Sequence, residues 1–279
     1  MKTLKSNHIL LLIILSILGH SCQTDDILEE NLQENNVQQS LANFEAYHFM
    51  YMHYPSGIMF GTNNGITQIE YDNQNRPVKR TGGLLALPWS TGFSYIFSND
   101  YYEEIVYGNN EISLTVKVAL PNYTDFLKTI FKTENGKIIK KINLGGSAND
   151  TTEYYYSNEK IVKSIRKKNT PISESNYYYS NGNIDSIVTK PLKLNTVTQI
   201  WQVDPLSKIK TVESFKDFDS SVNPTKKMML FEEIFHRSLS ENNYRSYESK
   251  SFDIAGNVYD SSTRKWTFNY VNNQIKFTN

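Results

Sequence analysis

Two stretches of this chain repeat one pattern: three consecutive tyrosines, a short polar turn, and a second segment of alternating apolar residues. The first spans residues 152–165 and the second residues 175–187, an offset of 23 residues. The alternation on both sides of the turn has the period of a β-strand with one packed face and one solvated face. Asn181-Gly182 favours a tight type I′ turn, because both central residues of that turn need a positive φ. Each stretch is therefore predicted to form a β-hairpin.

Looser copies of the pattern begin at residues 66, 126 and 266, and Asn135-Gly136 supplies the turn of one of them. Single hairpins are marginal in water, so successive hairpins are expected to pair side by side and bury a shared core. The chain contains 19 Tyr and 14 Phe, which fit the pleated surface of a sheet. The predicted fold class is all-β, an antiparallel meander of stacked β-hairpins that repeats every 23 residues or so.

One segment departs from the strand pattern. Apolar residues stand at positions 228, 231, 234 and 235, which is the spacing of one face of a helix. Pro224 lies shortly before them and suits the approach to a helix. The sequence therefore predicts one short helical or irregular insert near residues 227–238.

Residues 1–21 have the features of a signal peptide. Two lysines precede a mostly apolar run from Ile9 to Leu18, which is too short to cross a hydrocarbon core of about 30 Å. Cys22, the only cysteine of the chain, follows directly. The segment resembles a bacterial lipoprotein signal, in which this cysteine carries the lipid and becomes the first residue of the mature protein. Gly19 and His20 depart from the usual pattern, and an ordinary secretory signal is the alternative.

Residues 22–42 are predicted to be the lipidated cysteine and a disordered tether, because they are rich in Gln, Asn and Glu and cannot bury enough apolar surface to order the chain. Gln23–Asp26 resembles the acidic signal that sends many Bacteroidota lipoproteins to the outer face of the outer membrane. We therefore expect a lipid anchor in the cell outer membrane, facing outward. Residues 43–279 are predicted to form a single β-hairpin-repeat domain.

Charge and cysteine content restrict the partners. Removing Lys2 and Lys5 with the signal from the 29 basic residues leaves 27 against 29 acidic ones. The basic residues are dispersed, whereas nucleic-acid binding needs them clustered on one face, so no nucleic-acid partner is expected. With Cys22 lipidated, no disulfide stabilises the folded part. The membrane, through the lipid on Cys22, is the expected partner.

The repeated hairpins resemble YD-type (RHS-like) repeats. The C-terminal stretch resembles more closely a family of Bacteroidota lipoproteins of unknown function, through Phe215–Asp219, Asn223-Pro224 and Ser240–Asn243. The likeness covers residues 65–279 and departs from the family pattern at Val258-Tyr259 and Val271-Asn272, where its Asp and Gly turn residues are diluted. That family has no assigned activity, so the resemblance implies fold and location only.

The candidate metal ligands are unfavourably spaced. His48 and His53 would lie on opposite faces of a strand, about 17 Å apart, which does not suit a zinc pair. His48 with Met50 and Met52 would share a face that suits Cu(I), but core packing explains these residues better. Asp217–Ser221 opens like a calcium loop but lacks the Gly at position six and the Glu at position twelve. We predict no metal site and no cofactor.

No G-x-S-x-G, H-E-x-x-H or P-loop motif is present, so we predict no enzyme activity. Because strand residues alternate between faces, each tyrosine triplet must expose at least one ring. The candidate ligand-stacking residues are Tyr154, Tyr156, Tyr177 and Tyr179, suited to sugar rings or peptide; the alternative is a ladder that only stabilises strand pairing. The sequence therefore predicts a lipid-anchored, surface-exposed binding or scaffold protein without catalytic activity, whose partner is a glycan or another surface protein. The first alternative is a glycan-binding accessory lipoprotein, and the second is a hydrolase.

Overall fold

The computed structural model of the chain describes residues 43–45, 58–60, 65–87, 89–119, 127–145, 150–226, 228–271 and 274–276. All of them belong to one unit, residues 40–279. The predicted signal peptide, lipidated Cys22 and tether lie outside the described residues, as do His48, Met50, Met52 and His53. Their roles stay predictions.

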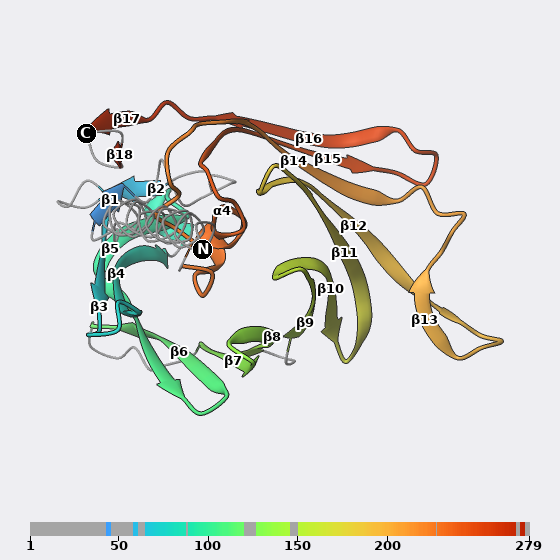
Figure 1. The fold of residues 1–279 in the computed structure, drawn as a ribbon, viewed down its shortest axis with the longest axis horizontal. Coiled ribbons are helices and arrows are strands. Elements are labelled where there is room, and N and C mark those ends of the chain that lie inside the picture. Colours follow the sequence, from blue (N-terminus) through green and yellow to red (C-terminus); the bar gives the residue numbers. More distant parts are fainter. Residues whose placement is uncertain are drawn as a thin grey trace, which may run out of the picture. The chain divides into compact units, whose positions relative to one another are not determined.

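Strands dominate the described residues, with three short helical segments (Figure 1). The helical segments are η1 (Trp89–Thr91), η2 (Glu232–Ile234) and α4 (Phe235–Ser238). The strands are β1 (Asn43–Glu45), β2 (Ile58–Phe60), β3 (Ile66–Tyr71), β4 (Pro77–Ala86), β5 (Tyr95–Gly108), β6 (Glu111–Val118), β7 (Lys128–Glu134), β8 (Lys137–Leu144), β9 (Asp150–Ser157), β10 (Lys160–Lys168), β11 (Thr170–Ser180), β12 (Asn183–Asn195), β13 (Ile200–Val203), β14 (Lys210–Phe218), β15 (Tyr244–Phe252), β16 (Val258–Lys265), β17 (Asn269–Val271) and β18 (Gln274–Lys276).

Sixteen of these strands form one sheet in the order β1-β3-β4-β5-β6-β7-β8-β9-β10-β11-β12-β14-β15-β16. Two strands lie off this path: β13 pairs with β12, and β2 pairs in parallel with β5. Every neighbouring pair along the path is antiparallel, so the predicted all-β antiparallel meander is confirmed. The strands β17 and β18 form a separate two-stranded sheet.

The turns follow the local chemistry of the sequence. Asn135 and Gly136 have φ of 49° and 75°, and Asn181 and Gly182 have φ of 48° and 83°, so both predicted Asn-Gly turns are confirmed. The register then slips at the third residue of the following strand, at positions 139, 162 and 185. These three bulges lie 23 residues apart, and each reverses which side chains of its strand face the core.

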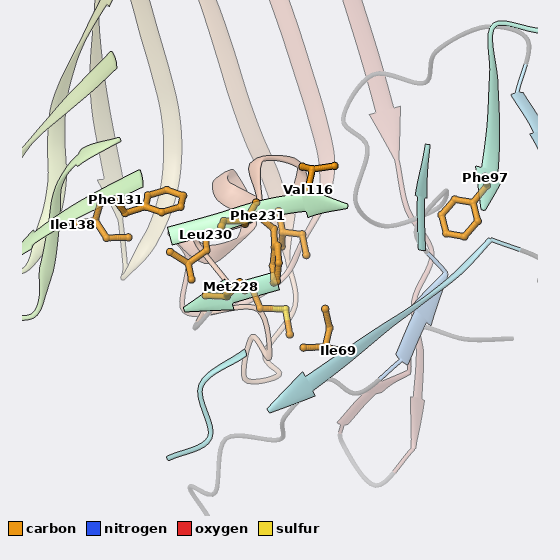
Figure 2. Close-up of a cluster of buried hydrophobic side chains, with 11 residues drawn as sticks. Ile69, Phe97, Val116, Phe131, Ile138, Met228, Leu230 and Phe231 are labelled. Atoms are coloured by element: carbon orange, nitrogen blue, oxygen red, sulfur yellow. The ribbon is translucent and has the colours of Figure 1, made fainter. Parts of the chain in front are cut away.

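The connection between β14 and β15, residues 219–243, contains the segment predicted near residues 227–238, and α4 is its only described α-helix. We call the whole connection the insert. Its buried side chains pack against strands far apart in the sheet order. The first cluster joins the insert to β3, β5, β6, β7 and β8: Ile69, Phe97, Ile105, Leu114, Val116, Phe131, Ile138, Met228, Leu230, Phe231 and Ile234 (Figure 2). The second consists of Ile161, Tyr177, Ile184, Ile187, Phe215, Tyr244, Tyr247 and Trp266, with Met229, Phe235 and Leu239 of the insert packed against it.

The insert therefore contributes four buried residues to the first cluster and partly buried side chains to the second, so its apolar side chains contact two sets of strands. Met228, Phe231 and Ile234 are buried as the spacing predicted. No helix among the described residues has the length and apolar composition that a membrane span requires.

Candidate functional site

The insert begins and ends at one place, and a buried asparagine holds the two ends together. The Asn223 side-chain amide donates to the carbonyl oxygens of Arg237 (2.6 Å) and Ser240 (2.9 Å). Its Oδ1 accepts hydrogen bonds from the backbone N–H and the hydroxyl of Thr225. All four bonding positions of the amide group are thus used inside the protein. The family resemblance had singled out Asn223, and the structure gives it this role.

The same polar network ties the insert to the β11–β12 turn. The backbone N–H of Asn242 donates to Asn183 Oδ1 (2.8 Å), and the Asn183 amide donates to Asn242 Oδ1 (3.2 Å). Ser240 Oγ accepts from the backbone N–H of Ile184 (3.1 Å). These bonds fix the ends of β12, β14 and β15 relative to one another. That arrangement positions the side chains described next.

Asp219 lies where β14 enters the insert, and its carboxylate is saturated by protein donors. Oδ1 accepts from the backbone N–H groups of Asn243 (3.0 Å) and Ser221 (3.2 Å). Oδ2 accepts from the hydroxyls of Ser221 (2.7 Å) and Tyr270 (2.8 Å). Desolvation and the bond to Asp219 raise the pKa of Tyr270 to about 12, so its hydroxyl is a donor at neutral pH. Asp219 therefore fixes the Tyr270 ring at this edge of the sheet.

Asp217 and Arg245 form an exposed ion pair beside that ring. Arg245 Nη2 is 2.7 Å from Asp217 Oδ1, and Arg245 Nε donates to the Asp217 carbonyl oxygen. Asp217 has a φ of 57°, although it stands within β14. A left-handed conformation is uncommon for a residue with a side chain and is enriched at binding and catalytic sites. Asp217, whose backbone is strained, thus places its carboxylate next to the Arg245 guanidinium.

Two open depressions flank Phe218 at this place. We call the larger one, of about 670 Å³, the Arg245 depression; it is lined by Phe218, Asp219, Ser220, Ser221, Arg245 and Tyr270. The smaller one, of about 340 Å³, we call the Asn183 depression; it is lined by Ser180, Asn181, Asn183, Asp185, Phe215, Lys216, Asp217 and Phe218. Hydroxyl, amide, carboxylate and guanidinium groups alternate around aromatic rings. Such a surface can bind a neutral, many-hydroxyl ligand through paired donors and acceptors.

The four tyrosines singled out in the sequence face the core side of the sheet. Tyr177 is buried, and its hydroxyl is 3.0 Å from Ser164 Oγ. Tyr154, Tyr156 and Tyr179 pack against the second cluster. Burial raises the pKa of Tyr156 and Tyr177 to about 12. Their role in ligand stacking stays a prediction. The middle rings of the triplets point the other way: Tyr155 is 40% exposed and Tyr178 is 52% exposed.

A buried group of charges fastens the insert to the other half of the sheet. Arg80 in β4 is almost fully buried, with Nε 3.1 Å from Glu103 Oε2 and Nη1 2.9 Å from Glu233 Oε2. Desolvation raises the pKa of Glu103 to about 7. Burial also opposes the ionisation of Glu233, but the charge and hydrogen bond of Arg80 outweigh it and hold that pKa below its usual value. Lys141 pairs with Glu232 nearby, and burial lowers the pKa of Lys141 to about 8.

Sequence reasoning did not find Arg245, Tyr270 or the Arg80 group as site residues. Arg80 and Glu233 are 153 positions apart, so no local pattern joins them. The Phe215–Asp219 and Ser240–Asn243 segments, which carried the family resemblance, did mark the neighbourhood of the depressions.

No protein-family model matches the chain, and a comparison with curated proteins also gives no match. Ten chains of solved structures are similar to it, among them two porin-like proteins. One is a porin-like protein from Bacteroides vulgatus ATCC 8482, with 10% identity and a TM-score of 0.44 over 79% of this chain and 90% of that one. The other is a porin-like protein from Bacteroides uniformis ATCC 8492, with 10% identity and a TM-score of 0.42 over 76% of this chain and 86% of that one.

Proposed function

We propose that the chain is a lipid-anchored, surface-exposed binding protein that holds a glycan in the Arg245 depression without altering it. The observation that carries this proposal is the exposed Asp217–Arg245 pair: Arg245 lines the depression of about 670 Å³ together with Tyr270, and Asp217 lines the smaller depression beside it. The strained backbone of Asp217 supports it, because such strain is enriched where a side chain must be presented to a ligand.

A saccharide suits this surface better than an ion or an apolar molecule. Sugar hydroxyls donate and accept at once, and Asp217 and Arg245 offer an acceptor and several donors side by side. The half-exposed rings of Phe218 and Tyr270 provide apolar faces for the C–H groups of a sugar ring. An anion would meet two carboxylates against one guanidinium, and an apolar ligand would leave these charges desolvated.

The arrangement of the carboxylates supports binding without hydrolysis. A glycosidase needs one carboxylic acid that delivers a proton and a second carboxylate that attacks or activates water. Both Asp219 oxygens accept hydrogen bonds from the protein, and Asp217 is paired with Arg245. Neither side chain is placed as a proton donor to a bound sugar.

The binding test presents the full chain with a panel of neutral linear oligosaccharides of glucose, mannose and galactose. Arg245→Ala should weaken binding of the best oligosaccharide about tenfold or more, since a hydrogen bond to a charged group contributes about 1.5–3 kcal/mol. Tyr178→Ala, which removes an exposed ring elsewhere in the sheet, should leave the affinity unchanged. Unaltered binding by Arg245→Ala, or no binding to any sugar of the panel, would refute the proposed site.

The anchor is tested separately in the native host. Cys22→Ala should release the chain from the membrane fraction, because no other residue of the signal can carry the lipid. Replacing Asp25 and Asp26 with Ala should keep the lipid and reduce the access of external protease on intact cells. A Cys22→Ala chain that resists a carbonate wash would refute the lipid anchor, and unchanged protease access would refute the sorting role of the acidic pair.

A further inference from the structure

Three turns at one end of the C-terminal strands each expose an aliphatic side chain. The turns are residues 195–199 between β12 and β13, 204–209 between β13 and β14, and 253–257 between β15 and β16. Antiparallel pairing places them at the end of these strands opposite the insert. Lys208 Nζ donates to the Ala255 carbonyl oxygen (3.1 Å), so the second and third turns are in contact.

Each turn is held by the side chain of an Asn or Asp. Leu206 follows Asp204, whose Oδ1 accepts the Leu206 backbone N–H (2.9 Å). Asn195 Oδ1 accepts the backbone N–H of Val197 in the same way. In the third turn, Asp253 Oδ1 accepts the backbone N–H of Asn257, and Ile254 lies between these two residues. Val197 is 90% exposed, Leu206 89% and Ile254 78%. These turns are therefore ordered, and they fix the aliphatic groups in solvent.

The hairpin turns at the opposite end of the sheet provide an internal comparison. They consist of Asn109-Asn110, Asn135-Gly136, Asn158-Glu159 and Asn181-Gly182, with no aliphatic residue. Seven of the sixteen exposed large apolar side chains among the described residues belong to the three turns and the strand residues next to them. We call this set the apolar end: Val197, Ile200, Leu206, Ile209, Ile254, Val258 and Tyr259. A concentration of this size marks a contact surface.

We propose that the apolar end rests in the surface of the membrane to which the chain is anchored, an inference that relies on the proposed lipid on Cys22. Separate convex turns can each place one aliphatic group among lipid chains. The residues around them include types found at a membrane interface, the exposed Lys193 and Lys208 and the amphipathic rings of Trp201 and Tyr259, next to the carboxylates of Asp204, Asp253 and Asp260.

The length of the tether favours the same occupant. The roughly 20 residues between Cys22 and Asn43 can span at most about 70 Å, so an anchored chain stays close to the bilayer at all times. Strand β15 leads from the apolar end to Tyr244 beside the Arg245 depression, a length of about 30 Å. Contact at the apolar end would therefore present the Arg245 depression about 30 Å from the lipid surface, facing outward.

The test uses the full lipidated chain reconstituted in vesicles of phosphatidylethanolamine and phosphatidylglycerol. Leu206→Cys and Ile254→Cys each introduce a thiol for an environment-sensitive nitrobenzoxadiazole dye, because the sulfur of lipidated Cys22 cannot react. Asn109→Cys, in an exposed polar turn at the opposite end, is the matched control. The two labels at the apolar end should shift their emission to the blue in vesicles and lose intensity when the acyl chains are brominated. The Asn109→Cys label should do neither.

Other outcomes separate the alternatives. A blue shift at positions 206 and 254 that needs no vesicles and grows with protein concentration would assign the apolar end to a second copy of the chain, which would overturn the inference. Unchanged emission in a chain that floats with the vesicles would overturn it while leaving the anchor intact. A chain isolated from the native host that carries no lipid on Cys22 and does not float with the vesicles would refute the anchor itself, and the inference with it.

Discussion

Glu103 is the side chain through which the buried charges can be tested by pH. It lies in β5, 6% exposed, between Arg80 and the hydroxyl of Tyr101, which donates to Glu103 Oε1 (3.0 Å). Arg80 also forms an ion pair with Glu233 of the insert, so one guanidinium interacts with two carboxylates. Desolvation raises the pKa of Glu103 from 4.5 to about 7, whereas Arg80 holds the pKa of Glu233 low. The folded protein therefore favours the protonated form of Glu103.

The sign of the pH effect follows from that direction. An acid whose pKa is raised on folding stabilises the folded state fully below its unfolded pKa and loses this contribution as pH rises through the folded pKa. The window here runs from 4.5 to about 7. At about 1.36 kcal/mol per pKa unit, ionisation of Glu103 destabilises the fold by about 3 kcal/mol. Glu103→Gln, which imitates the protonated acid, should match the parent at acid pH and exceed its stability by about 3 kcal/mol near pH 8.

Urea unfolding of both chains from about pH 5 to about pH 8 measures this difference, because all other titrating groups are shared. Glu104→Gln is the control: Glu104 is the next residue of β5 and pairs at the surface with Lys117, so its loss should change the free energy of unfolding by less than about 1 kcal/mol at every pH. A parent more stable than Glu103→Gln at pH 8, or a difference that does not change with pH, would refute the assignment of the shared arginine to Glu233.

Two further predictions concern the backbone that supports the site. Gly182→Val should destabilise the protein by about 1–2 kcal/mol through its left-handed conformation, and by more than Gly136→Val, because only at Gly182 would an added Cβ approach Glu241 Cγ to 2.7 Å; equal melting temperatures of Gly182→Val and the parent would contradict the turn assignment. Asn223→Ala should lower the free energy of unfolding by about 2–5 kcal/mol, since it removes the donor to the buried Ser240 carbonyl and the acceptor of the buried Thr225 N–H; a loss below about 1 kcal/mol in urea unfolding would show that water replaces the amide.

Local chemistry made much of the sheet predictable. Asn181-Gly182 needs no tertiary information to form its turn, and the period of two around it assigns Tyr179 and Ile184 to one face, where the two residues pair on the core side. The insert was found for the same reason: the stripe at Met228, Phe231 and Ile234 reflects burial, even though the α-helix itself covers only Phe235–Ser238.

The β-bulges limit how well the sequence predicts which side chains of a strand face the core. A strict period of two would place Ile161 and Ile165 on one face, but the register slips between Ile161 and Lys163. Beyond the slip, Ser164 pairs with Tyr154 on the core side and Ile165 pairs with Glu153 on the opposite side, so the expected common face is wrong. One extra residue in a strand can be of nearly any type, so the sequence carries no signal for it.

The Arg245 depression was unpredictable for a different reason. Arg245 and Tyr270 stand in separate strands, and the insert and the β15–β16 hairpin bring them together with Asp217. Only the pairing of β14 with β15 shows that Arg245 lies beside Asp217. No sequence pattern predicts that Asp217 adopts a left-handed backbone conformation within a strand.

The place of the insert in the chain has a consequence for how the protein folds. The strands β3 to β8 emerge early in synthesis, yet the apolar side chains that cover them come from residues 228–234, and Arg80 finds Glu233 only 153 positions later. The chain must close loops of that length before it gains any packing, which makes folding slow. Until the insert packs, the apolar faces of the early hairpins stay exposed to solvent. The export proposed for this chain should therefore depend on chaperones that bind its unfolded segments until residue 243 has crossed the membrane, and a truncation before the insert should aggregate rather than leave a folded half.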